Sequence, residues 1–225
     1  MTMSDTIEHK KKWRPTGWKG WAIVLILGMG TGYVVGAVAA KTGVDIEPAV
    51  LQALGTSGIV ALAIGVLYAI IGLILFGATS MPKFGQNLLT GPDAQDLIDA
   101  RPLYFMQSIA VALLGFALIV IALTGPGLAF GATTGGIGFL LLFLAGMALW
   151  LRSLPLMDEL VRTASWESTG WTYGLLVLFG GGWAVLAHIG FAAEPAALDW
   201  LSMFWGLALI GSTIAAVKRG MLAES

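Results

Sequence analysis

The hydrophobic residues of this chain fall in six long runs, and none of the runs contains Asp, Glu, Lys or Arg. A helix needs about 20 mostly apolar residues to cross a hydrocarbon core of about 30 Å, and each run meets or nearly meets that length. A transmembrane barrel would instead show segments of about ten residues that alternate between polar and apolar. The pattern therefore predicts an all-α fold, a polytopic transmembrane bundle of six helices. The predicted spans are Trp21–Ala40, Ser57–Gly77, Tyr104–Thr124, Gly135–Leu151, Trp171–Gly190 and Leu201–Val217.

The connections between these runs predict one membrane domain made of three consecutive hairpins. Residues 1–20 form a basic N-terminal tail, residues 21–217 form the transmembrane domain, and residues 218–225 form a C-terminal tail. The longest connection, residues 78–103, is too short for a separate soluble domain.

The positive charges predict how the bundle is oriented. If the chain crosses the membrane six times, both termini lie on one side, and of the 12 Lys and Arg residues only Lys41 falls on the other side. Cytoplasmic loops of membrane proteins carry an excess of Lys and Arg. We therefore expect both termini in the cytoplasm.

Composition agrees with a membrane protein and excludes several other classes. Hydrophobic residues make up 57% of the chain and charged residues 11%, whereas soluble domains carry about 25% charged residues. This argues against a soluble globular domain and against a disordered chain. The net charge is −1 and no basic stripe is present, so we expect the lipid bilayer as a partner and no nucleic acid. The absence of cysteine excludes disulfides, thiolate catalysis and cysteine-ligated metals.

Small residues in two spans suggest close helix contacts. Gly28, Gly32, Gly36 and Ala40 recur every four residues on one face of the first span. Such a ridge packs either inside the bundle or against another chain, including a second copy of this one. Gly180, Gly181 and Gly182 lie in the fifth span. Tight packing is the favoured interpretation of this triplet, and a hinge or the close approach of a lipid or cofactor is the alternative.

His188 is the candidate cofactor ligand, because it is the only histidine within a predicted span. A histidine at this depth can bind a metal, a haem or a chlorophyll magnesium, or can relay protons. The small Ala184 one turn earlier would leave room for a flat macrocycle. The alternative is an interfacial histidine bonded to water or to a backbone carbonyl. We predict no bound cofactor and no metal site, and leave open whether lipid or pigment is bound.

The polar stretch Leu154–Thr172 leads into the fifth span and holds the candidate ion-pair or transport residues. Glu159 and Arg162 are three residues apart and can pair on a helix. Glu167, just before the apolar run, could bind a cation or a proton at the cytoplasmic mouth of a path. A solvated helix end with an ion pair is the alternative. In the third span we expect Gln107 and Ser108 to bond a neighbouring helix.

The residues Met157-Asp158-Glu159-Leu160-Val161-Arg162, followed by Glu167 before an apolar run, resemble a stretch in small uncharacterised polytopic inner-membrane proteins of bacteria. The resemblance covers about 15 residues, within a helical hairpin arrangement. It implies a location in the bacterial inner membrane but no activity, and it assigns no role to any residue.

No catalytic motif is found in the sequence. It lacks His-Glu-x-x-His, a Gly-x-Ser-x-Gly within a span and a phosphate-binding loop with its lysine. We therefore expect a non-catalytic protein with no catalytic residues, an accessory or scaffolding subunit of a larger membrane complex. A small transporter or channel is one alternative. A pigment-, haem- or lipid/quinone-binding protein that uses His188 is another.

Overall fold

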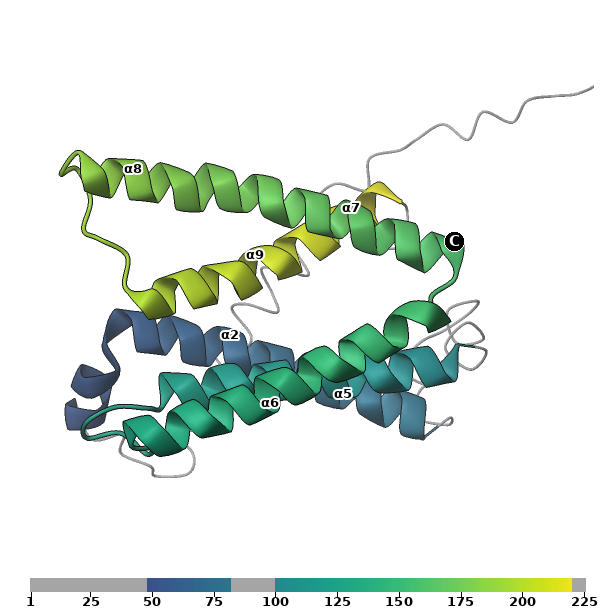
Figure 1. Ribbon diagram of the computed structural model, residues 1–225, viewed down its shortest axis with the longest axis horizontal. Coiled ribbons are helices and arrows are strands. Elements are labelled where there is room, and N and C mark those ends of the chain that lie inside the picture. Colours follow the sequence, from purple (N-terminus) through teal and green to yellow (C-terminus); the bar gives the residue numbers. More distant parts are fainter. Residues whose placement is uncertain (1–47, 82–99, 220–225) are drawn as a thin grey trace, which may run out of the picture.

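The computed structural model describes residues 48–81 and 100–219, and within these ranges the regular secondary structure is helical (Figure 1). The prediction of an all-α chain is confirmed for these residues. In chain order the elements are α2 (Pro48–Ser80), α5 (Arg101–Ala122), α6 (Ala132–Ser153), a 3-10 turn (Leu154–Leu156), α7 (Glu159–Leu176), a π-helical segment (Val177–Gly181), α8 (Gly182–His188) and α9 (Ala197–Lys218).

Among the described residues, five helical stretches are long and apolar enough to cross a membrane. They are Val50–Ser80, Arg101–Ala122, Ala132–Leu156, Glu159–His188 and Ala197–Lys218. Each overlaps one predicted span, from the second to the sixth. The first predicted span, residues 21–40 with Gly28, Gly32, Gly36 and Ala40, lies outside the described residues, as do the tail 1–20 and residues 220–225. The length and apolar character of these helices are compatible with an integral membrane protein.

The helix that contains the fifth predicted span begins at Glu159 rather than at Trp171, because the polar stretch before the apolar run is itself helical. The backbone N–H of Val161 donates to Oδ1 of Asp158 at 2.7 Å. An aspartate in this position satisfies one of the free N–H groups of the first turn and so favours a helix start. Only the second half of this helix is apolar, so the hydropathy pattern could not predict where the helix begins.

The long helix α2 is bent near its beginning at Gly55. This residue has φ +60° and ψ −179°, outside the helical range. Residues other than glycine rarely adopt a positive φ. The predicted span Ser57–Gly77 lies entirely beyond this bend.

Small residues allow α2 and α5 to pack closely. A Cβ atom added at Gly115 of α5 would lie 2.4 Å from the backbone nitrogen of Ala69 in α2. A Cβ atom at Gly72 of α2 would lie 2.4 Å from the backbone nitrogen of Ala112 in α5. Atoms cannot approach this closely, so the contact requires glycine at both positions. In a membrane, where helices gain little from burying apolar surface against one another, such backbone proximity is a main source of association.

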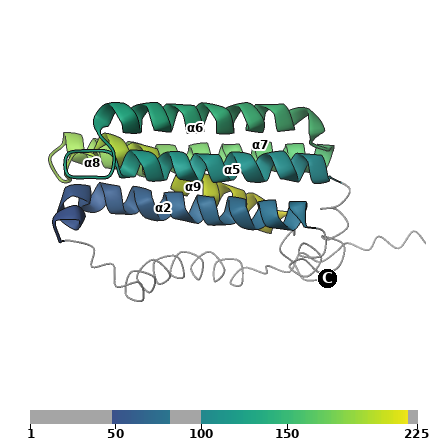
Figure 2. The same ribbon diagram turned by 90° about the horizontal axis from the view of Figure 1, so that it is seen from below.

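The described helices form two packed groups. Helices α6, α5 and α2 lie side by side, and α7, α8 and α9 lie behind them (Figure 2). Between the groups, Tyr68 of α2 donates its hydroxyl proton to the carbonyl of Trp205 in α9 at 2.9 Å. Contacts between α6 and α7 are few. The two groups are therefore joined mainly through α2 and α9.

Candidate functional site: a pocket and an ion-pair cluster

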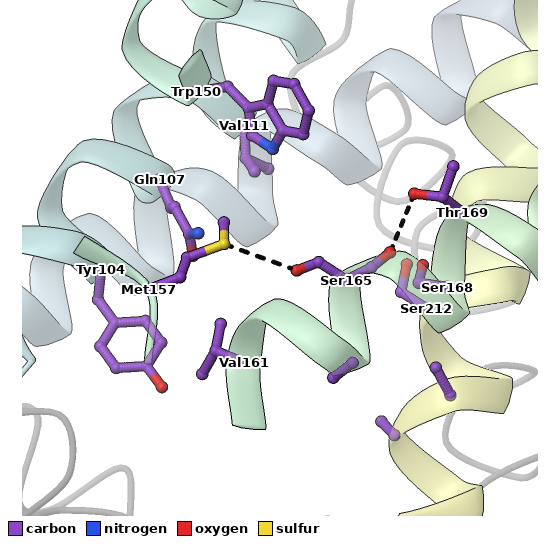
Figure 3. A pocket seen from close by; sticks show the side chains of 13 residues that line it. Tyr104, Gln107, Val111, Trp150, Met157, Val161, Ser165, Ser168, Thr169 and Ser212 are labelled. Carbon is purple, nitrogen blue, oxygen red and sulfur yellow. Dashed lines mark hydrogen bonds between the residues drawn. The ribbon is translucent and has the colours of Figure 1, made fainter. Parts of the chain in front are cut away.

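A pocket of about 490 Å³ lies where the two helix groups meet, between α5, α6, α7 and α9 (Figure 3). Its volume is in the range of small-molecule sites, which in helix bundles often lie between helices. The lining residues are Tyr104, Gln107, Val111, Trp150, Met157, Val161, Ala164, Ser165, Ser168, Thr169, Ser212, Ala215 and Ala216. No Asp, Glu, Lys, Arg or His is among them.

The polar groups of the pocket lie on two opposite sides. Gln107 and Trp150, from α5 and α6, face the hydroxyl side chains of α7 and α9 (Figure 3). Thr169 donates its hydroxyl proton to the carbonyl of Ser165 at 2.9 Å, and Ser212 donates to the carbonyl of Ala208. These two hydroxyl oxygens keep their lone pairs available as acceptors.

The structure differs from our expectation for Gln107 and Ser108. Ser108 donates to the carbonyl of Phe105 in its own helix at 2.8 Å and not to a neighbouring helix. Gln107 lines the pocket, and no hydrogen bond from its side chain to another described residue is found. Serine commonly bonds a carbonyl of the preceding turn, which the sequence spacing alone does not reveal.

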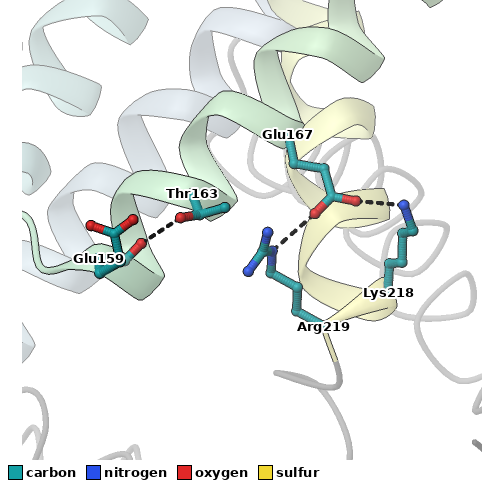
Figure 4. A network of polar contacts seen from close by, with 5 residues as sticks. All are labelled: Glu159, Thr163, Glu167, Lys218 and Arg219. Carbon is teal, nitrogen blue, oxygen red and sulfur yellow. Dashed lines mark hydrogen bonds and ion pairs between the residues drawn. The ribbon is translucent and has the colours of Figure 1, made fainter.

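Glu167 joins α7 to the end of α9 through two ion pairs (Figure 4). Its Oε1 accepts from Nζ of Lys218 at 2.7 Å, and its Oε2 accepts from Nε of Arg219 at 2.9 Å. Nζ of Lys218 also lies 5.8 Å from the ring centroid of Trp171. The carboxylate is therefore already paired with two cations. Sequence spacing could not reveal this pairing, because its partners follow 51 and 52 residues later.

The other two charged candidates are not paired with each other in the described part of the chain. The guanidinium of Arg162 donates from Nη2 to the carbonyl of Met157 at 3.2 Å. The carbonyl of Glu159 accepts from the hydroxyl of Thr163 at 2.6 Å (Figure 4). Arg162 thus closes the turn between the 3-10 segment and α7.

We expect the energetic coupling between Glu167 and Arg219 to be measurable in a double-mutant cycle. Both side chains are about one-fifth to one-quarter exposed, so water screens their pair less than it screens a fully exposed one. The changes in thermal midpoint for Glu167→Ala and Arg219→Ala in detergent should sum to more than the change for the double variant. The exposed Arg152, combined with Glu167→Ala in the same way, should give additive changes. If the changes are also additive for Glu167 and Arg219, the ion pair between them contributes nothing to thermal stability.

His188 is the last residue of α8 and is exposed. Among residues 48–81 and 100–219, no hydrogen bond from its ring is found, and no group of three His, Cys, Asp or Glu residues is placed to hold a metal ion. The role of His188 as a cofactor ligand stays a prediction.

The three glycines of the fifth span have different environments. A Cβ atom at Gly180 would lie 2.8 Å from Cε of Met203 and 2.9 Å from Cζ3 of Trp200, so this glycine packs tightly against α9. No atom of the described residues would lie within 4 Å of a Cβ at Gly181 or Gly182. The preceding segment is π-helical. Tight packing thus explains one glycine of the triplet.

Two further glycines, Gly170 and Gly174, lie on the outer face of α7, and we did not identify them from the sequence. We define this outer face by Trp166, Gly170, Tyr173 and Gly174 of α7, with Val177 at the start of the π-helical segment. These residues share one side of the helix at spacings of three and four. It points away from the pocket, which is lined by residues on the opposite side of α7 such as Val161 and Ser168. The Gly-x-x-x-Gly spacing is the sequence signal that could have identified it.

No protein-family model matches the chain, and no curated protein or solved structure matches it.

Proposed function

We propose that this chain is a non-catalytic accessory or scaffolding subunit of a larger membrane complex, and that a helix of another subunit packs against the outer face of α7. The observation that carries this proposal is the exposure of the two glycines in that face. No described atom would lie within 4 Å of a Cβ at Gly170 or at Gly174.

These glycines have no internal explanation among the described residues. Glycine inside a helix is less favourable than alanine by about 1 kcal/mol. At Gly72 and Gly115 that cost is offset by close packing of α2 on α5. At Gly170 and Gly174 no described helix occupies the space. A Gly-x-x-x-Gly pair permits a second helix to approach closely, so a partner helix accounts for both positions.

The surrounding side chains also favour a protein partner over lipid. Trp166 and Tyr173 are 71% and 68% exposed, and residues of these types are enriched at protein interfaces. Of the candidate spans, α5 is the most buried and the segment Glu159–His188 is the least buried. It is also the least apolar, with a mean hydropathy of 1.3. A partner helix would cover the exposed aromatic side chains of the outer face.

The proposal includes six spans in three hairpins, with both termini in the cytoplasm of a bacterium and the domain in its inner membrane. Support comes from the cations of the described residues. The start of α5, the end of α6, the start of α7 and the end of α9 all lie at one end of the bundle (Figure 1). Each of these helix ends carries a cation, and the residues are Arg101, Arg152, Arg162, Lys218 and the adjacent Arg219. Arg101 also donates to the carbonyl of Thr79 at the end of α2, at 2.8 Å. One positively charged end is typical of a cytoplasmic face.

Photo-crosslinking in native membranes tests the partner directly. Tyr173 is replaced by p-benzoylphenylalanine, and the control position is Leu141, which is 66% exposed on α6 among other large apolar side chains. We expect a covalent adduct with another polypeptide from position 173 and only lipid adducts from position 141. Lipid adducts alone from position 173, or a crosslink within the same chain, would contradict the proposal.

A further inference from the structure

Among the described residues, none that lines the pocket between α5, α6, α7 and α9 is charged. The guanidinium of Arg162, next in sequence to the lining residue Val161, donates to the backbone carbonyl of Met157. Burying a charged ligand group without a counter-charge is strongly unfavourable. The pocket therefore suits an uncharged molecule.

Two hydrogen-bond donors in the pocket are available to such a molecule. Neither the side-chain amide of Gln107 nor the indole N–H of Trp150 donates to another described residue. Both lie on the same side of the pocket (Figure 3). A pair of free donors on one wall matches a ligand with carbonyl oxygens, which only accept hydrogen bonds.

The remaining walls are mostly apolar, and some lining residues are neighbours in sequence of the charged residues of α7 and α9. Valine, alanine and methionine side chains, including Val111, Val161 and Met157, make up much of the lining. Ser168 directly follows Glu167 of α7, and Ala216 is two residues before Lys218, which ends α9 and pairs with Glu167. Charged residues at a helix end mark the membrane surface. A molecule with a polar headgroup and an apolar tail can place its headgroup here and its tail in the bilayer.

We propose that this pocket binds the uncharged, carbonyl-bearing headgroup of a lipid-soluble molecule. Gln107 and Trp150 donate to the carbonyl oxygens, while the hydroxyl oxygens of Thr169 and Ser212 accept from any hydroxyl group that the ligand carries. Two sources supply this headgroup chemistry, the ring of an isoprenoid quinone and the ester groups of a diacylglycerol. The site involves neither His188 nor the outer face of α7, so this proposal is independent of the subunit proposal.

The test is a calorimetric titration of the purified full chain in dodecyl maltoside with decylubiquinone and, separately, with 1,2-dioctanoylglycerol. Binding of the first assigns a quinone, and binding of the second assigns a glyceride. Gln107→Leu and Trp150→Phe should each weaken binding by about fivefold, the effect of losing one neutral hydrogen bond. The matched control is Gln52→Leu, which makes the same change at an exposed position in the first turns of α2, outside the pocket lining.

Three results would overturn the assignment. The first is no saturable binding of either compound by the wild-type chain. The second is equal affinity of the wild-type chain, Gln107→Leu and Trp150→Phe, provided that circular dichroism shows unchanged helicity. The third is saturable binding of the anionic lipid dioleoylphosphatidylglycerol alone, because it would mean that the site selects a charged headgroup.

Discussion

Gly115→Ala is expected to lower the free energy of unfolding by about 2 kcal/mol or more, the cost of overpacking a tight contact. The new methyl group would lie 2.4 Å from the backbone nitrogen of Ala69 and 2.7 Å from the carbonyl oxygen of Gly65. Because both neighbours are backbone atoms, no rotation of a side chain can relieve the overlap. Helices α2 and α5 must move apart, and their shared contact is the most extensive between the described helices. Unfolding by sodium dodecyl sulfate, followed by circular dichroism, measures the change.

Gly136→Ala is the matched control for this prediction. Gly136 lies inside α6, and no described atom would lie within 4 Å of its Cβ. Alanine is the better helix former, so this variant should gain up to about 1 kcal/mol. Equal stabilities of the two variants would show that α2 and α5 do not approach as closely as described.

Gly174→Ile is expected to reduce the amount of partner protein that co-purifies by about tenfold, which corresponds to about 1.4 kcal/mol of association free energy. A branched side chain at this position would keep a second helix from reaching the backbone of α7. The chain itself should still fold, since no described atom would lie within 4 Å of the new Cβ. The measurement is the ratio of partner to chain after purification from native membranes in a mild detergent.

The same substitution at Gly136 provides the comparison, because Gly136 is also helical and unobstructed but lies on α6. Gly136→Ile should keep the wild-type ratio. If Gly174→Ile also keeps the wild-type ratio of partner to chain, the outer face of α7 contacts lipid. A partner helix would then not explain the glycines at positions 170 and 174.

The helices were predictable because their signal is local. A continuous apolar run predicts a transmembrane helix wherever it occurs, and all five described spans overlap a predicted one. The start of the helix that contains the fifth span was not predictable from hydropathy, because the residues from Glu159 to Thr172 are largely polar. The N-cap at Asp158 favours a helix start there, and the ion pairs of Glu167 hold this helix against the end of α9.

The pocket and the α2–α5 contact depend on residues that are far apart in the sequence. Gln107, Trp150, Ser168 and Ser212 come from four helices, and nothing near any one of them in the sequence identifies the other three. The partners of Gly72 and Gly115 follow from the relative position of two helices, which hydropathy does not encode. By contrast, the Gly170–Gly174 spacing was visible in the sequence, and only the structure shows that no described helix covers it.

The most direct test of the subunit proposal is the mass of the particle that contains the chain after gentle extraction from native membranes into lipid nanodiscs. The chain itself has a mass of 23.6 kDa. We expect a larger protein particle of defined composition that contains at least one different membrane protein, and we expect Gly174→Ile to remove that protein. Recovery of the wild-type chain as a lone 23.6 kDa species would contradict its assignment as an accessory subunit.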